Sequence, residues 1–281
     1  MLRLIQAWKY LRTALDAEGL RGKIVLARYY FAMLATHALR FMLRALPQSV
    51  RYRVREPRLS REVALKGETG RFLLRAGTAD GWVVGRGYEL GVREFLAAVL
   101  RPGQVFVDVG AHIGLYTVMA GRLLAPGGVV IAVEPSQDNF EALLKNVQQN
   151  GLTNVIPINA ACWSNDCELE LIPSSTATGF WHRVGPITGH GTKISAKRLD
   201  TIFQDLGLGA IDVIKIDAEG ASAKVVEGAS MILRRFRSVQ VLFEVERPGE
   251  LEGSCRTLHG LGFTVRRLFG NQYLATVTSG Q

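Results

Sequence analysis

The sequence predicts an α/β fold built on a doubly wound, mostly parallel sheet with an antiparallel edge strand. Between residues 105 and 246, short apolar runs alternate with stretches of helical periodicity, which is typical of parallel strands joined by crossover helices. The last two apolar runs, FTVRRLF and QYLATVT, have no helix between them, which indicates an antiparallel pair. The 281 residues, 48% of them hydrophobic, suit one large domain with an appendage.

The elements of the main domain are expected in a regular order. A helix from about Tyr88 to Leu100 precedes a first core strand that ends at Asp108. Ser136 is a good N-cap and Gly151 a good stop for the helix between them. The later elements are strands at 155–162 and 168–172, a polar loop at 173–192, a helix at 199–206, a strand at 212–217, a helix at 221–236, a strand at 239–246 and a helix at 250–259.

The chain is expected to divide into a basic helical extension at 1–58, a small β cap at 59–87 and the main domain at 88–281. The extension holds twelve Lys or Arg and three Asp or Glu, a net charge of +9, whereas the rest of the chain is neutral. Its apolar stretch from Lys23 to Pro47 is interrupted by arginines. The longest part without Lys or Arg, Tyr29 to Leu39, is shorter than the roughly 20 residues of a membrane-spanning helix.

Two roles of this extension remain open. Its helix could lie in an anionic membrane interface, with arginines reaching the headgroups. The preferred role is packing on the main domain or on a second copy in a homodimer. Nucleic acid is not an expected partner, because the main domain is neutral. The three cysteines (Cys162, Cys167 and Cys255) form no disulfide or zinc pattern, which favours a cytoplasmic protein, free or peripheral to the membrane.

The segment from Val105 to Pro135 has the order of a nucleotide-cofactor half-site: strand, acid, glycine turn, helix, strand, acid. Its spacing, with Asp108, Gly110 and Gly114, differs from the Gly-x-Gly-x-x-Gly of dinucleotide sites, where the backbone approaches a pyrophosphate. A carboxylate at the turn repels phosphate but accepts hydrogen bonds from a cationic amino-acid ligand. The pattern therefore favours S-adenosylmethionine over NAD, with Glu134 placed to accept hydrogen bonds from the ribose hydroxyls.

Four ordered motifs also carry a family resemblance: VDVGAHIGLYT (107–117), EPSQDNFEALLKNVQQN (134–150), KRLDTIF (197–203) and IKIDAEG (214–220). Together they resemble the FkbM-type S-adenosylmethionine-dependent methyltransferases, which have the Rossmann-like class I methyltransferase fold. The similarity runs from about Tyr88 to about Glu246. It implies O-methylation of a hydroxyl on a small-molecule, sugar or polyketide-like acceptor.

Further cofactor contacts are expected around this half-site. The backbone of Ala111 and of the two glycines is expected to approach the cofactor closely, and Ala161 could expose its backbone to the adenine. The resemblance implies that Tyr88 and Glu89 contact the amino-acid end. Members of the family commonly carry Glu where this chain has Ser222, so no role is assigned to a carboxylate there.

Methyl transfer is an in-line displacement, so the protein has to align the acceptor and remove the proton of its hydroxyl. Asp217 ends the fourth strand and Glu219 follows at the next turn, so either could act as the base or orient the acceptor. His182, in the long polar loop, is a further catalytic candidate. Lys215 shares a strand face with Asp217 and could pair with it or extend to solvent.

No metal is expected. Asp217 with Glu244 or Glu246 could bind Mg²⁺, but paired carboxylates also accept hydrogen bonds from a cofactor or substrate, and the fifth strand lacks an Asp-Asn pair.

Three other functions are less favoured. The glycine spacing argues against a nucleotide-dependent oxidoreductase. The sequence lacks an Asn-Pro-Pro-Tyr-like motif for a base pocket, which argues against a nucleic-acid methyltransferase. The third alternative is a non-catalytic, membrane-associated protein that binds the cofactor and keeps the fold without turnover.

Overall fold

The computed structural model describes residues 2–42, 57–173, 182–247 and 249–277. Its internal contacts divide the chain into two compact units. The first unit comprises residues 1–94 with the short segments 148–151 and 173–181, and the second comprises the remainder.

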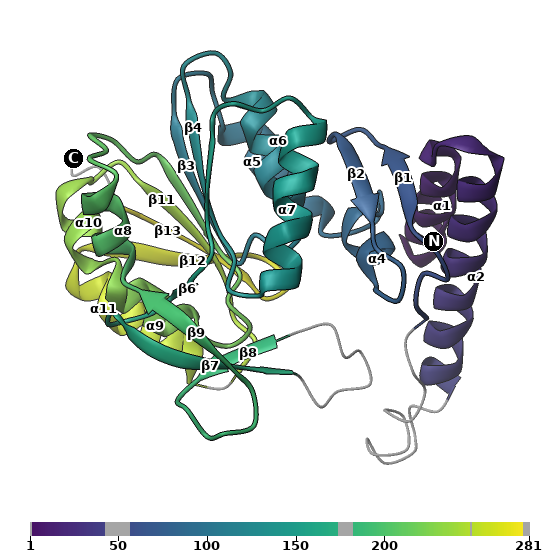
Figure 1. Cartoon of the computed structure of the whole chain (residues 1–281). Helices are drawn as coiled ribbons and strands as arrows, with labels where there is room; N and C mark the ends of the chain where they lie inside the picture. The colour runs from purple at the N-terminus through teal and green to yellow at the C-terminus, as the bar shows by residue number, and fades with distance from the viewer. Residues whose placement is uncertain (1, 43–56, 174–181, 248, 278–281) are drawn as a thin grey trace. The chain divides into compact units, whose positions relative to one another are not determined.

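The first unit combines two N-terminal helices with a two-stranded hairpin (Figure 1). Its elements are α1 (Leu2–Thr13), the 3-10 turn η1 (Ala14–Asp16), α2 (Gly19–Met42), β1 (Val63–Lys66), β2 (Arg71–Leu74) and α4 (Asp80–Val84). The Glu18 amide donates a 2.8 Å hydrogen bond to the Ala64 carbonyl. The Asp16 carboxylate accepts hydrogen bonds of 2.8 and 2.9 Å from Arg86. These contacts join the helices and the hairpin into one folded unit.

Helix α2 confirms the helix expected from Lys23, although it begins earlier, at Gly19, and residues 43–56 lie outside the described residues. One side of α2 is buried through Leu26, Tyr29, Tyr30 and Met33. The Tyr30 hydroxyl donates a 2.6 Å hydrogen bond to the Gly81 carbonyl, which fixes α2 against α4. In the part of the chain that the structure describes, no helix is long and apolar enough to cross a membrane.

The expected β cap contains a helix as well as strands. β1 and β2 confirm the expected short strands and pair antiparallel, whereas residues 80–84 form α4. The physical reason is a local turn that the Asp80 side chain fixes. Its buried carboxylate accepts three hydrogen bonds of 2.8–2.9 Å from the backbone and guanidinium of Arg75, which turns the chain into the helix.

The second unit is built on a seven-stranded sheet, counted over the described residues, with the order β12-β13-β11-β10-β3-β4-β5. Five strands are parallel, and β13 is antiparallel to both of its neighbours. This arrangement confirms the predicted doubly wound sheet and its antiparallel edge. The strands are β3 (Val105–Val109), β4 (Val129–Val133), β5 (Val155–Ile158), β10 (Val213–Ile216), β11 (Gln240–Glu244), β12 (Phe263–Phe269) and β13 (Gln272–Val277).

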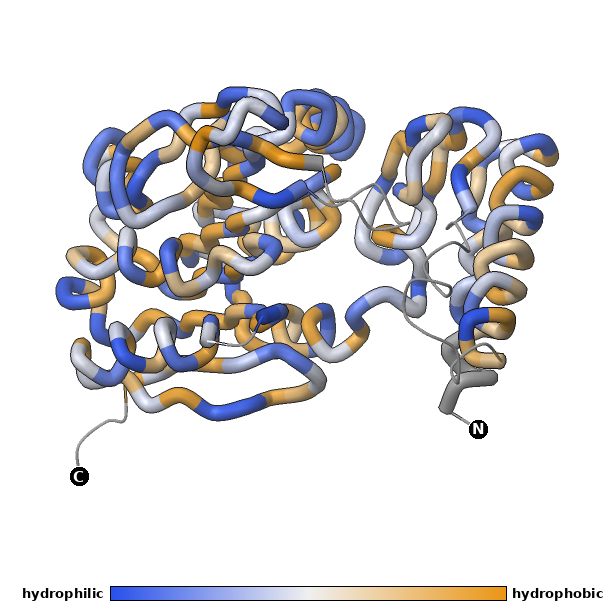
Figure 2. Tube along the Cα trace, turned by 90° about the horizontal axis from the view of Figure 1, so that it is seen from below, coloured by the Kyte–Doolittle hydropathy of each residue, from blue (hydrophilic) through white to orange (hydrophobic). Residues whose placement is uncertain are grey.

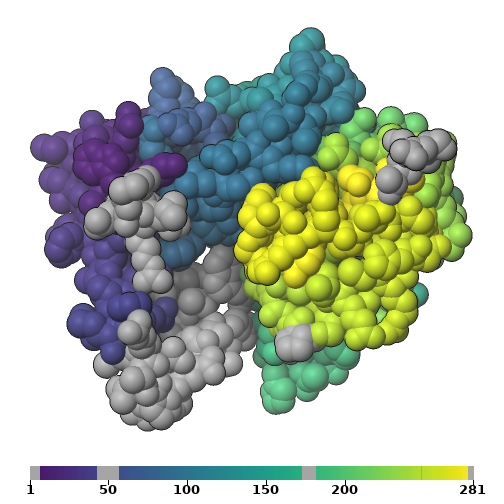
Figure 3. All heavy atoms as spheres, turned by 180° about the vertical axis from the view of Figure 1, so that it is seen from behind, coloured from purple at the N-terminus to yellow at the C-terminus, as the bar shows by residue number. Residues whose placement is uncertain are grey.

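Helices cover both faces of this sheet (Figure 1). On one face, α6 (Leu115–Leu123) and α7 (Gln137–Gln149) pack on β3 and β4. The other face buries the larger core under α8 (Leu199–Asp205), α9 (Ser222–Gly228), α10 (Ser230–Arg235) and α11 (Glu250–Gly260). Helix α5 (Leu90–Val99) spans the division between the units. The C-terminal part of the chain, yellow in Figure 3, lies at the surface of the second unit.

A second, four-stranded sheet corrects two predictions. It contains β6 (Ala161–Cys162), β7 (Cys167–Pro173), β8 (His182–Gly185) and β9 (Thr192–Lys197) in the order β6-β9-β7-β8. The strand expected over 155–162 is therefore two strands in different sheets. The Asn159 side chain donates a 2.9 Å hydrogen bond to the Glu134 carbonyl, which holds the turn between them. The loop expected at 173–192 includes the strand β8, while its residues 174–181 lie outside the described residues.

The helix expected over 221–236 is also divided, into α9 and α10. Gly228 ends α9 where a Cβ atom would lie 2.0 Å from the Trp163 carbonyl oxygen, so only glycine permits this approach. Asp200 then accepts hydrogen bonds of 2.9–3.1 Å from the backbone N–H groups of Met231 and Ile232. A side chain from α8 thus starts a new helix after the break.

Candidate cofactor and acceptor site

The strand order reverses between β3 and β10, and ligands of such sheets bind beyond the carboxyl ends of the strands at that point. Gly110 follows β3 and Asp217 follows β10. Gly110 has a φ of +77°, and a Cβ atom there would lie 1.8 Å from the Asp217 carbonyl oxygen. Only glycine therefore allows the two turns to pack together.

Asp108 is fully buried at the end of β3. Its Oδ2 atom accepts a 2.7 Å hydrogen bond from the Thr117 hydroxyl, whereas Oδ1 is buried with no hydrogen-bond partner among the described residues. Burial raises the pKa of Asp108, and the charge of Lys215 and the Thr117 hydrogen bond oppose that rise. A buried carboxylate with one oxygen that accepts no hydrogen bond fits a ligand that carries a hydrogen-bond donor, such as an amino-acid ammonium group.

Glu134 is held by the turn after β3 and by the start of α7. Its carboxylate accepts hydrogen bonds from the backbone N–H of His112 (2.8 Å) and of Ser136 (2.9 Å), and from Asn139 Nδ2 (3.3 Å). Burial raises the pKa of Glu134 to about 7, and the backbone hydrogen bonds oppose that rise. A carboxylate can accept about four hydrogen bonds, so capacity remains for a ribose hydroxyl.

The residues whose backbone was predicted to approach the cofactor, Gly110, Ala111 and Gly114, lie in the turn between β3 and α6. The backbone N–H groups of Gly110 and Ala111 both donate to the Val133 carbonyl, at 2.9 and 3.0 Å. Gly114 precedes α6 with a φ of +90°, and a Cβ atom there would lie 2.6 Å from the Leu143 side chain. The turn is therefore anchored to β4 and α7 through glycine-specific contacts.

Lys215 is buried in β10, directly beside Asp108 in the register of the two strands. Its ammonium group forms a 3.1 Å ion pair with Asp217 Oδ2 and lies 4.6 Å from the ring centre of Tyr116. The pairing with Asp217 confirms one of the two orientations that the sequence left open. A single buried cation thus pairs with the carboxylate that follows β10 and lies beside the carboxylate within β3.

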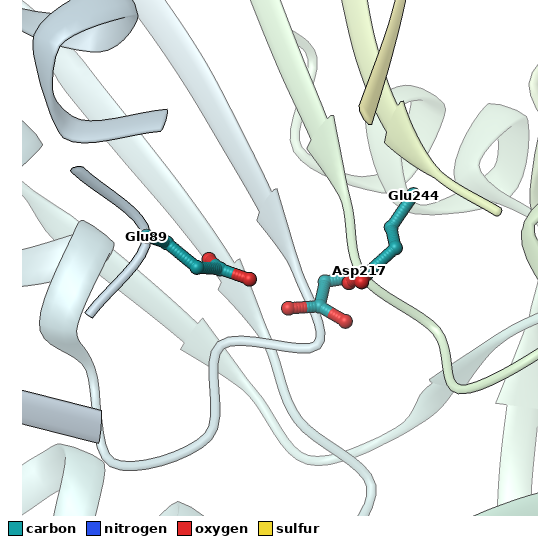
Figure 4. A group of neighbouring side chains, drawn as sticks. All are labelled: Glu89, Asp217 and Glu244. Atoms are coloured by element: carbon teal, nitrogen blue, oxygen red, sulfur yellow. The ribbon is translucent and has the colours of Figure 1, made fainter. Parts of the chain in front are cut away.

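Carboxylates gather where β10 and β11 end. Asp217 and Glu244 each have a carboxylate oxygen within 4.8 Å of the other (Figure 4). Glu219 has a φ of +47°, a conformation that non-glycine residues rarely adopt. Burial and the nearby charges of Asp217 and Glu246 raise the pKa of Glu219 well above its usual range.

Four further predicted residues have the following positions in the chain. Tyr88 and Glu89, the latter also drawn in Figure 4, belong to the first unit, in the turn before α5. Ala161 is buried and begins β6 of the smaller sheet, instead of ending a strand of the main sheet. His182 begins β8, at the edge of the same smaller sheet. Their roles stay predictions.

A carboxylate from a residue distant in the sequence lies at the start of α9. Glu250 Oε1 accepts a 2.8 Å hydrogen bond from the Ser222 amide at the start of α9. Its Oε2 atom accepts hydrogen bonds from the amides of Glu246 and Arg247, at 2.8 and 3.2 Å. Sequence reasoning did not find this role of Glu250. Thr117 was also missed, although its place in the first turn after the glycines was a usable signal.

A family model and a curated relative both identify one family. The model of the Methyltransferase FkbM domain matches residues 108–265. The 31-O-demethyl-FK506 methyltransferase FkbM of Streptomyces tacrolimicus is 30% identical over an alignment of 197 residues, which covers 59% of this chain and 75% of that protein. A tRNA(Phe) (4-demethylwyosine(37)-C(7)) aminocarboxypropyltransferase of Methanocaldococcus jannaschii is 31% identical over 91 residues, 32% of this chain and 35% of that protein.

Solved structures are similar at a lower level. The methyltransferase FkbM of Methylobacillus flagellatus KT has a TM-score of 0.46 and 16% identity, covering 65% of this chain and 50% of that chain. The family assignment comes from the sequence matches, which include more than half of the chain and the residues of the half-site. The chain therefore belongs to the family of FkbM-type methyltransferases, which depend on S-adenosylmethionine.

Proposed function

We propose that this methyltransferase acts on a hydroxyl group of a small-molecule, sugar or polyketide-like acceptor. The observation that supports it is the position of Asp217. Asp217 follows β10 at the reversal point of the sheet, where its backbone carbonyl packs against the Gly110 turn and its carboxylate is paired with Lys215. A hydroxyl has to lose its proton during transfer, and a carboxylate at this point is suited to accept or orient that proton.

The roles of the residues follow from their contacts. S-adenosylmethionine, when bound, supplies a methyl group on a sulfonium that needs no further activation. Asp108 would hold its ammonium group through the unsatisfied Oδ1 atom, and Glu134 would accept hydrogen bonds from its ribose. Asp217 would receive the hydroxyl proton, and Glu219, at the turn that follows, would help to orient the acceptor. His182 is the alternative proton acceptor.

The test is turnover of Asp217→Asn on a panel of hydroxyl acceptors with radiolabelled S-adenosylmethionine. We expect kcat to fall about 100-fold or more, with cofactor affinity unchanged within a few-fold. Asp205→Asn, at an exposed ion pair with Lys197, is the matched control and should keep full activity. Full activity of Asp217→Asn would exclude this role, and the corresponding loss in His182→Ala would transfer the role to His182.

We also propose that catalysis needs no metal. Asp217 and Glu244 are close enough to share a cation, but the Glu244 carboxylate already accepts a hydrogen bond from Asn271, and Asp217 is paired with Lys215. Activity should therefore survive incubation with EDTA. Activity that EDTA abolishes and Mg²⁺ restores would instead make these carboxylates metal ligands.

We propose a cytoplasmic location for the enzyme. Cys162, Cys167 and Cys255 are all unpaired in the structure, and Cys162 is buried, as expected for cysteines that serve packing in a reducing compartment. Fractionation of cells into periplasmic, membrane and cytoplasmic material would test this location. Recovery of the chain from the periplasm would contradict it.

A further inference from the structure

Helix α2 has two apolar sides, and only one of them is buried. Leu26, Tyr29, Tyr30 and Met33 pack into the first unit. On the other side a second set of apolar residues follows at alternating spacings of four and three, which places the set on one stripe of a helix. The members of this stripe are Leu20, Ile24, Ala27, Phe31, Leu34 and Ala38.

This stripe faces solvent. Leu20 is 75% exposed, Ile24 49% and Phe31 73%. At 1.5 Å per residue the stripe extends over about 27 Å. Figure 2 shows hydrophobic residues on successive turns of the N-terminal helices. A helix that is apolar on both sides is normally buried on both sides, so an apolar partner is expected for the stripe.

The charges that border the stripe identify the partner. Arg21 and Arg28 lie seven residues apart along one border, and Lys23 lies on the other; all three are exposed. α2 contains no Asp or Glu at all. A second copy pairing through this stripe would bring the basic borders of two helices together with no carboxylate of α2 to compensate them, and like charges at flanking positions destabilise helix pairs. An apolar surface bordered by negative charge is complementary to the stripe and its borders.

We propose that the exposed face of α2 binds the surface of an anionic lipid bilayer. The helix would lie in the plane of the headgroups, with Ile24 and Phe31 reaching the acyl boundary and with Arg21, Lys23 and Arg28 at the lipid phosphates. The basic residues within α2 and the result that no described helix is suited to span a membrane both fit a helix that lies on the bilayer. The enzyme would then act next to the membrane.

The experiment is flotation of the full chain with two kinds of vesicle, phosphatidylcholine alone and phosphatidylcholine with about one third phosphatidylserine. We expect binding to the anionic vesicles only, weakened by added salt because exposed charges are screened. Replacing Arg21, Lys23 and Arg28 together by Gln should weaken binding by on the order of 100-fold, from about fivefold for each basic residue. Ile24→Ser with Phe31→Ser should abolish binding.

Two control variants show whether a loss of vesicle binding is specific to the stripe on α2 or follows from substitution of any exposed side chain. Met231→Ser removes an apolar side chain that is 61% exposed on α10, and Arg256→Gln removes an exposed arginine on α11; both should bind vesicles like the wild type. All variants change exposed side chains, so thermal unfolding and cofactor binding should be unaltered. Equal binding to neutral vesicles would overturn the proposal. So would a salt-resistant dimer, lost in Phe31→Ser, that binds no vesicles, because a second copy would then occupy the stripe.

Discussion

The ammonium group of Lys215 donates a 3.1 Å hydrogen bond to the carboxylate of Asp217, two residues further along the chain. Lys215 is buried and also lies beside Asp108 in the neighbouring strand, where its charge opposes the rise in the pKa of that carboxyl. The cation therefore serves both the predicted cofactor contact and the predicted acceptor contact. Such a buried pair requires both partners, because a buried charge left alone is strongly unfavourable.

Lys215→Met should destabilise the protein by about 3 to 5 kcal/mol, the usual effect of breaking a buried ion pair. The loss should depend on pH. Asp108 has a folded pKa above its unfolded value, so its contribution to stability is present below the unfolded pKa and is lost as the pH rises through the folded pKa. Removing Lys215 raises that folded pKa further, so the variant should lose more stability than the wild type as pH increases.

Urea unfolding at about pH 4.5 and about pH 8 would measure this difference. Lys224→Met, at an exposed ion pair with Glu227, is the control and should change stability by less than about 1 kcal/mol at either pH. A Lys215→Met variant with the same deficit at both pH values would show that Lys215 has no electrostatic effect on Asp108.

Gly110→Ala should lower the free energy of unfolding of the second unit by more than the backbone strain of an alanine at this positive φ would cause. The φ of +77° is unfavourable for alanine by about 1 kcal/mol or more, and the added Cβ would also collide with the Asp217 carbonyl. Gly207→Ala is a matched control, because Gly207 has a φ of +62° with no atom within 4 Å of an added Cβ. Equal unfolding free energies for the two variants would mean that the turns do not pack as described.

The sequence predicted the half-site well because its determinants are local. An apolar strand, an acid, a glycine turn and an amphipathic helix lie within thirty residues, and the structure has β3, the Gly110 turn, α6 and β4 there. The helix from Ser136 and the antiparallel pair at the C-terminus were confirmed for the same reason.

Other features depend on residues far apart in the sequence. Lys215 meets Asp108 only through the register between β10 and β3. The break between α9 and α10 depends on Asp200 and on the close approach of Trp163 to Gly228, neither of which helical periodicity can show. Ala161 was placed at the end of a main-sheet strand because the apolar run continues through the turn at Asn159.

Glu134→Ala should weaken binding of S-adenosylmethionine by roughly 1.5 to 3 kcal/mol, the scale of a lost charge-assisted hydrogen bond. The reason is that the ionised carboxylate would accept hydrogen bonds from ribose hydroxyls. Calorimetry would measure the affinity, with Glu141→Ala on the exposed side of α7 as the control. NAD should give no signal with the wild type, and NAD binding without S-adenosylmethionine binding would contradict the cofactor site.

Glu134 should also make stability depend on pH near neutrality. Its folded pKa of about 7 lies above the ordinary value of 4.5, so its contribution to stability is fully present below about pH 4.5 and is lost as the pH rises through 7. Glu134→Gln removes this titration while keeping the shape of the side chain. The wild type should therefore lose up to about 3 kcal/mol relative to Glu134→Gln between pH 4.5 and 8. Parallel stability curves of the two proteins would show that Glu134 is ionised throughout.

Asp200→Ala should destabilise the protein by about 1 to 2 kcal/mol, because two N–H groups in the first turn of α10 would lose their acceptor. The Arg198 guanidinium would lose its 2.6 Å ion pair at the same time. Asp205→Ala, at an exposed pair on the same helix, should have less than half this effect. Hydrogen exchange gives the more specific result: amides of Met231 and Ile232 should lose protection in Asp200→Ala, while amides of α9 keep theirs. Equal loss along both helices would mean that α9 and α10 unfold as one helix and that Asp200 does not start the second.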